Sequence, residues 1–341
     1  MASSTYISAL LRRLRSGGEH QSVQAAGTLV DLCAGSDDNR AAIVAADAIP
    51  ALVQCISSSG VSDDLLEAAA TLLRNLSVDS PGTAASIAAA GAISALVQRA
   101  CSSCSEAVQF QAAATLSCLS VDSPDCRVAI AAAGGIPVMV QLLRSSTASE
   151  EEKVVAAGAL GCLSVDSPGT KAAIGAAGAI PLLVQLLRST ASEEVQVVAT
   201  QALCFLSVDS PGNKAAIGAA GAIPLLVQLL RSTASEELQI AAANALRFFS
   251  EDSPGNKAAI GAAGAIPALV QLLRSTTSEK VQLRATFALG CLSRDIPDSS
   301  AAIAAANGIA ALQQPHSSSP SEAVREETAA ALRSLSHSAG V

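Results

Sequence analysis

Hydrophobic and polar residues follow a pattern that repeats along the chain about every 43 residues. The segment Ser164–Glu194 returns as Ser207–Glu237 with one change, Thr170 to Asn213, and looser copies cover the rest of the chain. The isoleucine of a Gly-Ala-Ile-Pro step marks the register, and successive isoleucines are 43 or 44 residues apart: Ile49, Ile93, Ile136, Ile180, Ile223, Ile266 and Ile309. A fixed period of this length predicts a repeat architecture.

Proline and glycine residues that mark helix starts and turns predict three helices in each repeat. Ser210 and Pro211 supply an N-cap and a first-turn proline for a short first helix. Gly221 allows a sharp corner, after which a second helix ends near Arg231. The motif Thr233-x-x-Glu236 resembles a capping box and opens a longer third helix through Phe249. Its apolar residues recur at helical spacing: Leu238, Ala242, Leu246 and Phe249.

The whole chain, residues 1–341, is expected to be one all-α domain. Residues 1–33 match only the last two helices of a repeat, Tyr6–Ser16 and His20–Cys33, and form an N-terminal half repeat or cap. Seven repeats occupy residues 34–336, and a polar tail covers residues 337–341. Apolar residues make up 50% and aromatic residues 2%, so the core must consist of Ala, Leu, Ile and Val, which suits closely packed helices.

Charge and hydropathy exclude several classes of partner. The net charge of −8 and a pI near 4.9 argue against nucleic acid, which requires a basic field. The apolar run Ala172–Leu187 is interrupted and too short to span a membrane, so no membrane partner is expected. The start, Met1–Thr5, lacks the charged and apolar regions of a signal peptide, and the nine cysteines suit a reducing compartment. These features predict a cytoplasmic protein, with nuclear access left open.

The repeat motif resembles the armadillo repeat. The segments Asn213–Leu230 and Asn256–Leu273 carry its N-K-A-A-I-G-A-A-G-A-I-P-x-L-V-Q-L-L pattern, and Ala202–Ser207 carries its A-L-x-x-L-S ending. The resemblance covers essentially the whole chain and is greatest to the armadillo arrays of plant-type U-box ubiquitin ligases; no U-box is expected before residues 1–33, which are already repeat. It implies a right-handed α-solenoid, an armadillo superhelix whose third helices line a concave groove.

The resemblance also implies how such a groove binds extended peptide. Peptide-binding members carry an Asn late in the third helix and a Trp one turn earlier. Only Asn75 matches that Asn, and no repeat carries the Trp. The other residues at the Asn position are Asp31, Cys118, Cys162, Phe205, Phe248, Cys291 and Ser334. The sequence therefore does not predict capture of a basic nuclear-localisation peptide.

Third helices differ more between repeats than first and second helices do. Val195–Ser207 and Leu238–Ser250 diverge although the segments before them are nearly identical, which favours a fixed scaffold with a diversified face. Chance drift after a recent duplication, or consensus engineering, is the alternative. The predicted partner contacts on this face are Asn75, Gln201, Phe205, Asn244, Arg247, Phe248 and Phe287. The alternative is that these phenylalanines belong to the core, but Leu203, Leu206 and Leu246 already fill core positions.

Charged residues also recur with the repeat. Arg127, Lys171, Lys214 and Lys257 stand five residues after Asp122, Asp166, Asp209 and Asp252. They suggest either a docking stripe or, with more weight, solvated corner pairs of small energetic value.

A non-enzymatic adaptor is the predicted function. It would bind a partner protein or peptide segment in the groove as a monomer, without cofactor or metal. One alternative is a thiol-based redox sensor or enzyme using Cys101 and Cys104, the only Cys-x-x-Cys in the chain. Another is a structural element that self-associates through its end repeats.

Overall fold

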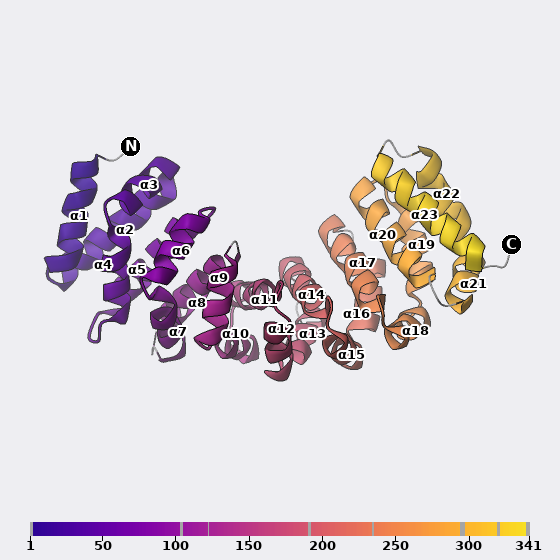
Figure 1. Ribbon diagram of the computed structural model, residues 1–341, viewed down its shortest axis with the longest axis horizontal. Coiled ribbons are helices and arrows are strands. Elements are labelled where there is room, and N and C mark those ends of the chain that lie inside the picture. The colour runs from indigo at the N-terminus through magenta and orange to yellow at the C-terminus, as the bar shows by residue number, and fades with distance from the viewer. Residues whose placement is uncertain are drawn as a thin grey trace. The chain divides into compact units, whose positions relative to one another are not determined.

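The protein is an all-α array of three-helix repeats. The computed structural model describes residues 3–102, 105–121, 123–189, 192–233, 235–293, 297–318 and 321–338, which form 23 helices and no strand. Helix packing divides the chain into two compact units, Met1–Leu163 and Ser164–Val341. Figure 1 shows the helices of each unit following one another in chain order.

In the first unit, two helices precede three repeats. The opening pair is α1 (Ser4–Ser16) and α2 (Glu19–Gly35), close to the predicted half repeat. The repeats comprise α3 (Asp37–Ala45), α4 (Ala48–Ser57), α5 (Asp63–Ser77), α6 (Pro81–Ala89), α7 (Ala92–Ser102), α8 (Glu106–Val121), α9 (Pro124–Ala132), α10 (Gly135–Arg144) and α11 (Glu150–Ser164). The third helices α2, α5 and α8 lie side by side.

In the second unit, four repeats follow the same order of short, medium and long helix. They comprise α12 (Pro168–Ala176), α13 (Ala179–Ser189), α14 (Glu193–Ser207), α15 (Pro211–Ala219), α16 (Ala222–Ser232), α17 (Glu236–Ser250), α18 (Pro254–Ala262), α19 (Ala265–Ser275), α20 (Glu279–Ser293), α21 (Pro297–Ala305), α22 (Gly308–Ser318) and α23 (Glu322–Ser338). The third helices α14, α17, α20 and α23 pack in sequence.

Local sequence signals place the helix ends largely as predicted. Gly221 adopts φ 81°, a left-handed conformation that glycine tolerates without a Cβ penalty, and it separates α15 from α16. Ser210 occupies the N-cap position of α15, as predicted, although its side chain makes no capping hydrogen bond. The capping-box assignment was wrong by two residues: Ser235, not Thr233, caps α17, because the Ser235 hydroxyl accepts from the Leu238 N–H at 3.4 Å.

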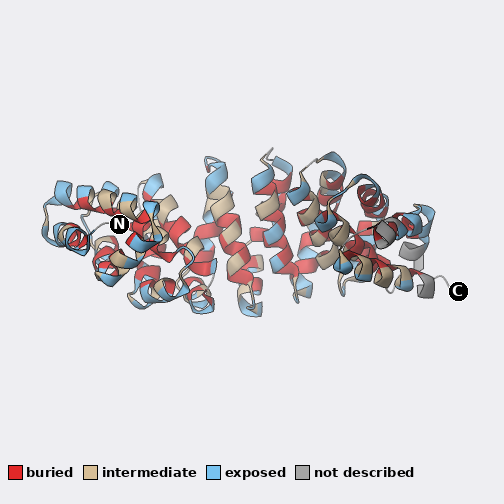
Figure 2. Ribbon diagram, turned by 90° about the horizontal axis from the view of Figure 1, so that it is seen from above, coloured by how far each residue is buried: buried red, intermediate tan, exposed pale blue. Residues whose placement is uncertain are grey.

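The core consists of aliphatic side chains on the helix faces that meet neighbouring helices. Figure 2 shows buried residues along these faces and exposed residues at helix ends and turns. Leu238, Ala242, Leu246 and Phe249 of α17 are at most 1% exposed, as their spacing predicted.

Lysine side chains bond backbone carbonyl groups at the corners where repeats end. Lys171 Nζ donates to the Val208 carbonyl at 2.7 Å, and Lys214 Nζ donates to the Glu251 carbonyl at 2.6 Å. Lys171 and Lys214 are each 6% exposed and Lys257 is 8% exposed. The prediction that these lysines form solvated pairs or a docking stripe was therefore wrong. A lysine can be buried here because its ammonium reaches a carbonyl at a helix end, a partner that no local motif reveals.

The aspartates of the predicted pairs have a different role. Asp166, Asp209 and Asp252 adopt φ 54°, 51° and 50° in the corners between repeats, a left-handed conformation that Asp tolerates better than most residues. Asp122 lies outside the described residues. Arg127 Nη1 donates to the carbonyls of Ser120 and Val121.

An asparagine and a glycine from successive repeats also fit together. Asn213 Nδ2 donates to the carbonyl of Lys171 in the preceding repeat at 3.1 Å and to that of Leu206 at 3.0 Å. A Cβ atom on Gly175 would overlap Asn213 Oδ1, so the glycine makes room for the asparagine. Asn256 repeats this arrangement with Gly218.

Candidate functional site

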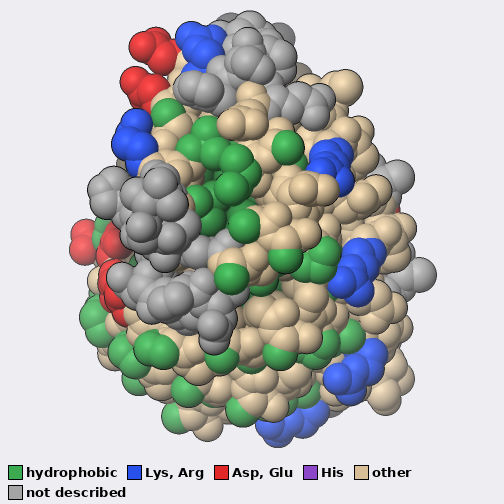
Figure 3. Space-filling view, turned by 90° about the vertical axis from the view of Figure 1, so that its right-hand side faces the viewer, with side chains coloured by type: hydrophobic (Ala, Val, Ile, Leu, Met, Phe, Trp, Pro, Cys, Tyr) green, Lys and Arg blue, Asp and Glu red, His purple; other side chains and the backbone are tan. Residues whose placement is uncertain are grey.

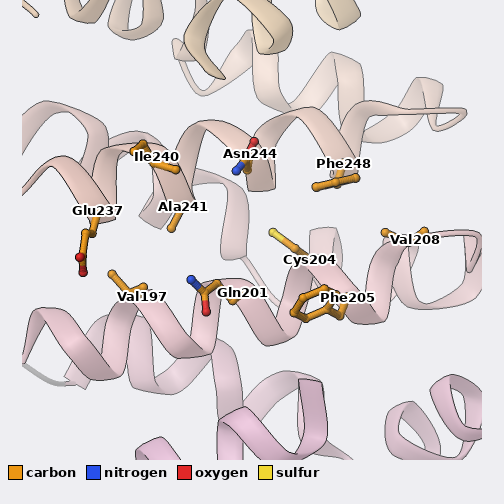
Figure 4. Close-up of a pocket in the computed structure, with 10 residues that line it drawn as sticks. All are labelled: Val197, Gln201, Cys204, Phe205, Val208, Glu237, Ile240, Ala241, Asn244 and Phe248. Atoms are coloured by element: carbon orange, nitrogen blue, oxygen red, sulfur yellow. The ribbon is translucent and has the colours of Figure 1, made fainter. Parts of the chain in front are cut away.

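A groove lies between the third helices α14 and α17 of the second unit. Its volume is about 460 Å³. Figure 4 shows side chains of the two helices facing each other across it. The lining residues are Val197, Gln201, Cys204, Phe205, Val208, Glu237, Ile240, Ala241, Asn244 and Phe248.

Helical spacing brings these residues to one surface. On α14, Val197, Gln201 and Phe205 follow one another at intervals of four, and on α17 Glu237, Ala241 and Asn244 do so at intervals of four and three. The opposite faces of the same helices supply the core, where Leu203, Leu206 and Leu246 are fully buried. The groove is therefore formed by the faces of α14 and α17 that do not pack into the core.

Four of the predicted contact residues line this groove: Gln201, Phe205, Asn244 and Phe248. Phe205 is 45% exposed, whereas Phe248 is partly exposed and its chain neighbour Phe249 is fully buried. The alternative that Phe205 belongs to the core is therefore wrong. Whether these residues bind a partner stays a prediction.

Arg247 and Phe287 lie next to the groove. The Arg247 guanidinium lies 4.1 Å from the Phe248 ring centroid and 5.6 Å from that of Phe287 on α20. Arg247 Nη1 pairs with Glu251 at 3.2 Å, which holds the guanidinium over the rings. Asn75 lies on α5 of the first unit and is partly exposed, so it does not belong to this cluster.

Two buried polar atoms near the groove lack a hydrogen-bond partner within the part of the chain that the structure describes. They are Asn244 Oδ1 and Arg247 Nε. An unpartnered buried acceptor or donor costs stability, and both atoms are closed to solvent in the unliganded chain.

Sequence reasoning missed six of the lining residues. These are Val197, Cys204, Val208, Glu237, Ile240 and Ala241. Five of them lie three or four residues from a predicted contact and Glu237 lies seven residues, or two helical turns, before Asn244, and this spacing was the available signal. Cys204 lines the groove although it is only 8% exposed.

The thiols of the groove and core are poorly suited to redox chemistry. Burial raises the pKa of the Cys204 thiol to about 12, although the nearby Arg247 guanidinium opposes the shift. Burial likewise raises the pKa of Cys33 to about 11 and also raises those of Cys55 and Cys118. A nucleophilic cysteine requires the opposite direction of shift. Cys101 is exposed, but Cys104 lies outside the described residues.

A candidate metal site is not found in the described ranges. They contain no group of three or more His, Cys, Asp or Glu side chains placed to hold a metal ion. On the C-terminal face in Figure 3, the visible lysine and arginine side chains stand apart from one another rather than forming a continuous basic patch. In the part of the chain described, no single helix is long and apolar enough to cross a membrane; six pairs of consecutive helices would be so by length and composition, but each pair is bent by 67–78°.

Comparisons with known proteins agree with this architecture. The model of the plant U-box protein armadillo-repeat region matches residues 6–308. None of the curated proteins matches the chain. The crystal structure of an engineered protein is 29% identical, with 100% of this chain and 83% of that chain covered and a TM-score of 0.88.

Two designed armadillo repeat proteins are also similar. One is 29% identical, with 72% of this chain and 99% of that chain covered and a TM-score of 0.66. The other, solved in complex with the peptide (KR)4, is 26% identical, with 71% of this chain and 99% of that chain covered and a TM-score of 0.64.

Proposed function

Because the chain belongs to the family of armadillo-repeat regions of plant U-box proteins, we propose that it is a non-catalytic scaffold that binds a segment of a partner protein. The segment would lie against the face formed by the third helices. The designed armadillo repeat protein solved with a peptide supports this kind of binding.

The exposure of aromatic side chains on the third helices carries the proposal. Phe205 is 45% exposed, and Phe248 and Phe287 are partly exposed, in a chain whose aromatic content is only 2%. Aromatic residues bury a large area at a low cost in side-chain entropy, and they are enriched among the residues that dominate binding energy. A face that only completed the fold would not need to expose them.

The remaining properties suit a protein partner. A pI near 4.9 disfavours nucleic acid. None of the eight cysteines of the described residues forms a disulfide, which suits a reducing compartment such as the cytoplasm. We expect the scaffold to be a monomer. Its mass measured by light scattering should then not change with protein concentration.

The test compares partner capture by the intact chain with capture by a Phe205→Ala, Phe248→Ala, Phe287→Ala variant. The control replaces three exposed apolar residues outside the third helices: Tyr6→Ala on α1, Val128→Ala on α9 and Ile309→Ala on α22. Circular dichroism verifies that both variants stay helical.

We expect specific partners to bind the intact chain and the control variant, and to be lost from the phenylalanine variant because it lacks the aromatic anchors. Partners that persist on the phenylalanine variant would place binding elsewhere and contradict the proposed site.

A further inference from the structure

The groove between α14 and α17 is chemically different at its two ends. It follows the two helices lengthwise, from Val197 and Glu237 at one end to Val208 and Phe248 at the other (Figure 4). Gln201 and Asn244 face each other between these ends. This order of acid, amides and aromatics restricts what the groove can accept.

The aromatic end suits an apolar side chain. Phe205, Phe248 and Val208 line it, and Phe205 is 45% exposed without a ligand. An apolar side chain inserted there would stabilise the complex in proportion to the apolar surface that leaves water. A charged side chain would gain less, because Arg247 beside Phe248 is already paired with Glu251.

The middle of the groove suits an extended backbone. The Gln201 side chain is exposed, and Asn244 is partly exposed and lines the groove opposite it. Carboxamides offer both a donor and an acceptor to backbone N–H and C=O groups. An extended segment has such groups available, whereas a helix already pairs them internally.

The far end suits a cation. Glu237 is exposed in the first turn of α17, and it belongs to none of the three ion pairs found among the described residues. A lysine or arginine on the ligand would pair with it without displacing an existing partner.

These observations together define the spacing between the apolar and the basic residue of the ligand. Glu237 and Phe248 are eleven residues apart on α17, so the groove is about 16 Å long at a rise of about 1.5 Å per residue. An extended chain covers that length in about five residues. We propose that the groove binds an extended protein segment with an apolar residue at Phe205 and Phe248 and a basic residue about five positions away at Glu237. This inference rests on the proposed function and specifies its ligand.

A library of random twelve-residue peptides displayed on phage tests the motif while the natural partner is still unidentified. The library is selected on the full chain, and the enriched peptides are synthesised and titrated by fluorescence anisotropy. Titrations use the intact chain, Glu237→Lys and the control Glu194→Lys. Glu194 is also exposed in the first turn of a third helix and gives the same change in charge, but it does not line the groove.

We expect enriched peptides to share an apolar and a basic residue about five positions apart. Glu237→Lys should weaken their binding by roughly tenfold, because attraction becomes repulsion, and Glu194→Lys should change it little. Enriched peptides without this spacing, with a helical spacing of about eleven, or indifferent to Glu237→Lys would overturn the inference.

A further titration separates this inference from the proposed function. If peptides are indifferent to Glu237→Lys but lost on the phenylalanine variant, only the motif is wrong. If they bind that variant unchanged, or if no peptide is enriched, the proposed function fails as well.

Discussion

Single atoms decide how consecutive repeats fit together. Asn213 Oδ1 occupies the space that a side chain on Gly175 would need, and Asn256 does the same at Gly218. The asparagine amide meanwhile bonds two carbonyls, one of them in the preceding repeat. Gly175 and Gly218 in the first helices therefore serve packing, although glycine lowers helix propensity.

Replacing Gly175 with Ala should destabilise the protein by about 1–3 kcal/mol, because the new methyl group forces Asn213 away from its hydrogen-bond partners. Gly169→Ala is the control in the same helix, since no described atom lies within 4 Å of its added Cβ. It should be neutral or slightly stabilising. Guanidinium unfolding of both variants measures the difference; equal stabilities would show that the Asn213 contact is unimportant.

The raised pKa of Cys204 predicts a loss of stability in alkali. In the unfolded chain this thiol ionises near pH 9.0, whereas burial in the folded chain raises its pKa to about 12. The contribution of this thiol to the unfolding free energy is therefore complete below pH 9. It falls as the pH rises from 9 toward 12, because only the unfolded state then releases the proton. Unfolding free energies measured from pH 8 to pH 11 should decline less steeply for Cys204→Ala than for Cys101→Ala, which alters an exposed cysteine. Equal slopes of unfolding free energy against pH in the two variants would contradict the raised pKa of Cys204.

At the scale of helices, lysine side chains connect the first helix of a repeat to the corner that ends it. Lys214→Met keeps the aliphatic stem but removes the donor to the Glu251 carbonyl. It should cost about 1.5–3 kcal/mol of unfolding free energy, the range for hydrogen bonds made by charged groups. Lys280→Met, at an exposed position of α20, is the control and should cost little in the same denaturation experiment. A similar loss in both variants would mean that the buried bond contributes nothing.

The helices themselves were predictable from sequence because their signals are local. Pro211 begins α15 and Gly221 turns the chain into α16, as proline and glycine geometry require. The prediction failed where two local signals overlap, since Thr233 and Ser235 both precede the third helix and only the structure shows that Ser235 caps it.

Long-range contacts were not predictable in the same way. The Lys214 partner lies 37 residues away, and a carbonyl group carries no sequence signature. The groove residues were predictable only in part. Helical spacing distinguished Phe248 from the buried Phe249, but the position of Cys204 in the groove depends on how α14 and α17 pack.

At the scale of the molecule, each unit owes its core to contacts between successive repeats. In the second unit, α14 packs on α17, α17 on α20 and α20 on α23. Stability in such arrays is approximately a sum of terms for each repeat and for each pair of neighbours. Changes on the exposed face of a third helix therefore affect the fold less than changes between repeats, which leaves that face free to vary.

The fit between asparagine and glycine also bears on how the array could grow. The repeat that begins near Asp209 carries Asn213, which needs a glycine in the repeat before it, and Gly218, which accepts an asparagine from the repeat after it. A tandem copy of this repeat is therefore compatible with itself on both sides. Two other repeats lack this pair of residues. Ala131 stands at the position equivalent to Gly175 in one repeat, and Thr170 stands at the position equivalent to Asn213 in the next repeat. Gene duplication can thus lengthen the array within its central repeats without any compensating mutation.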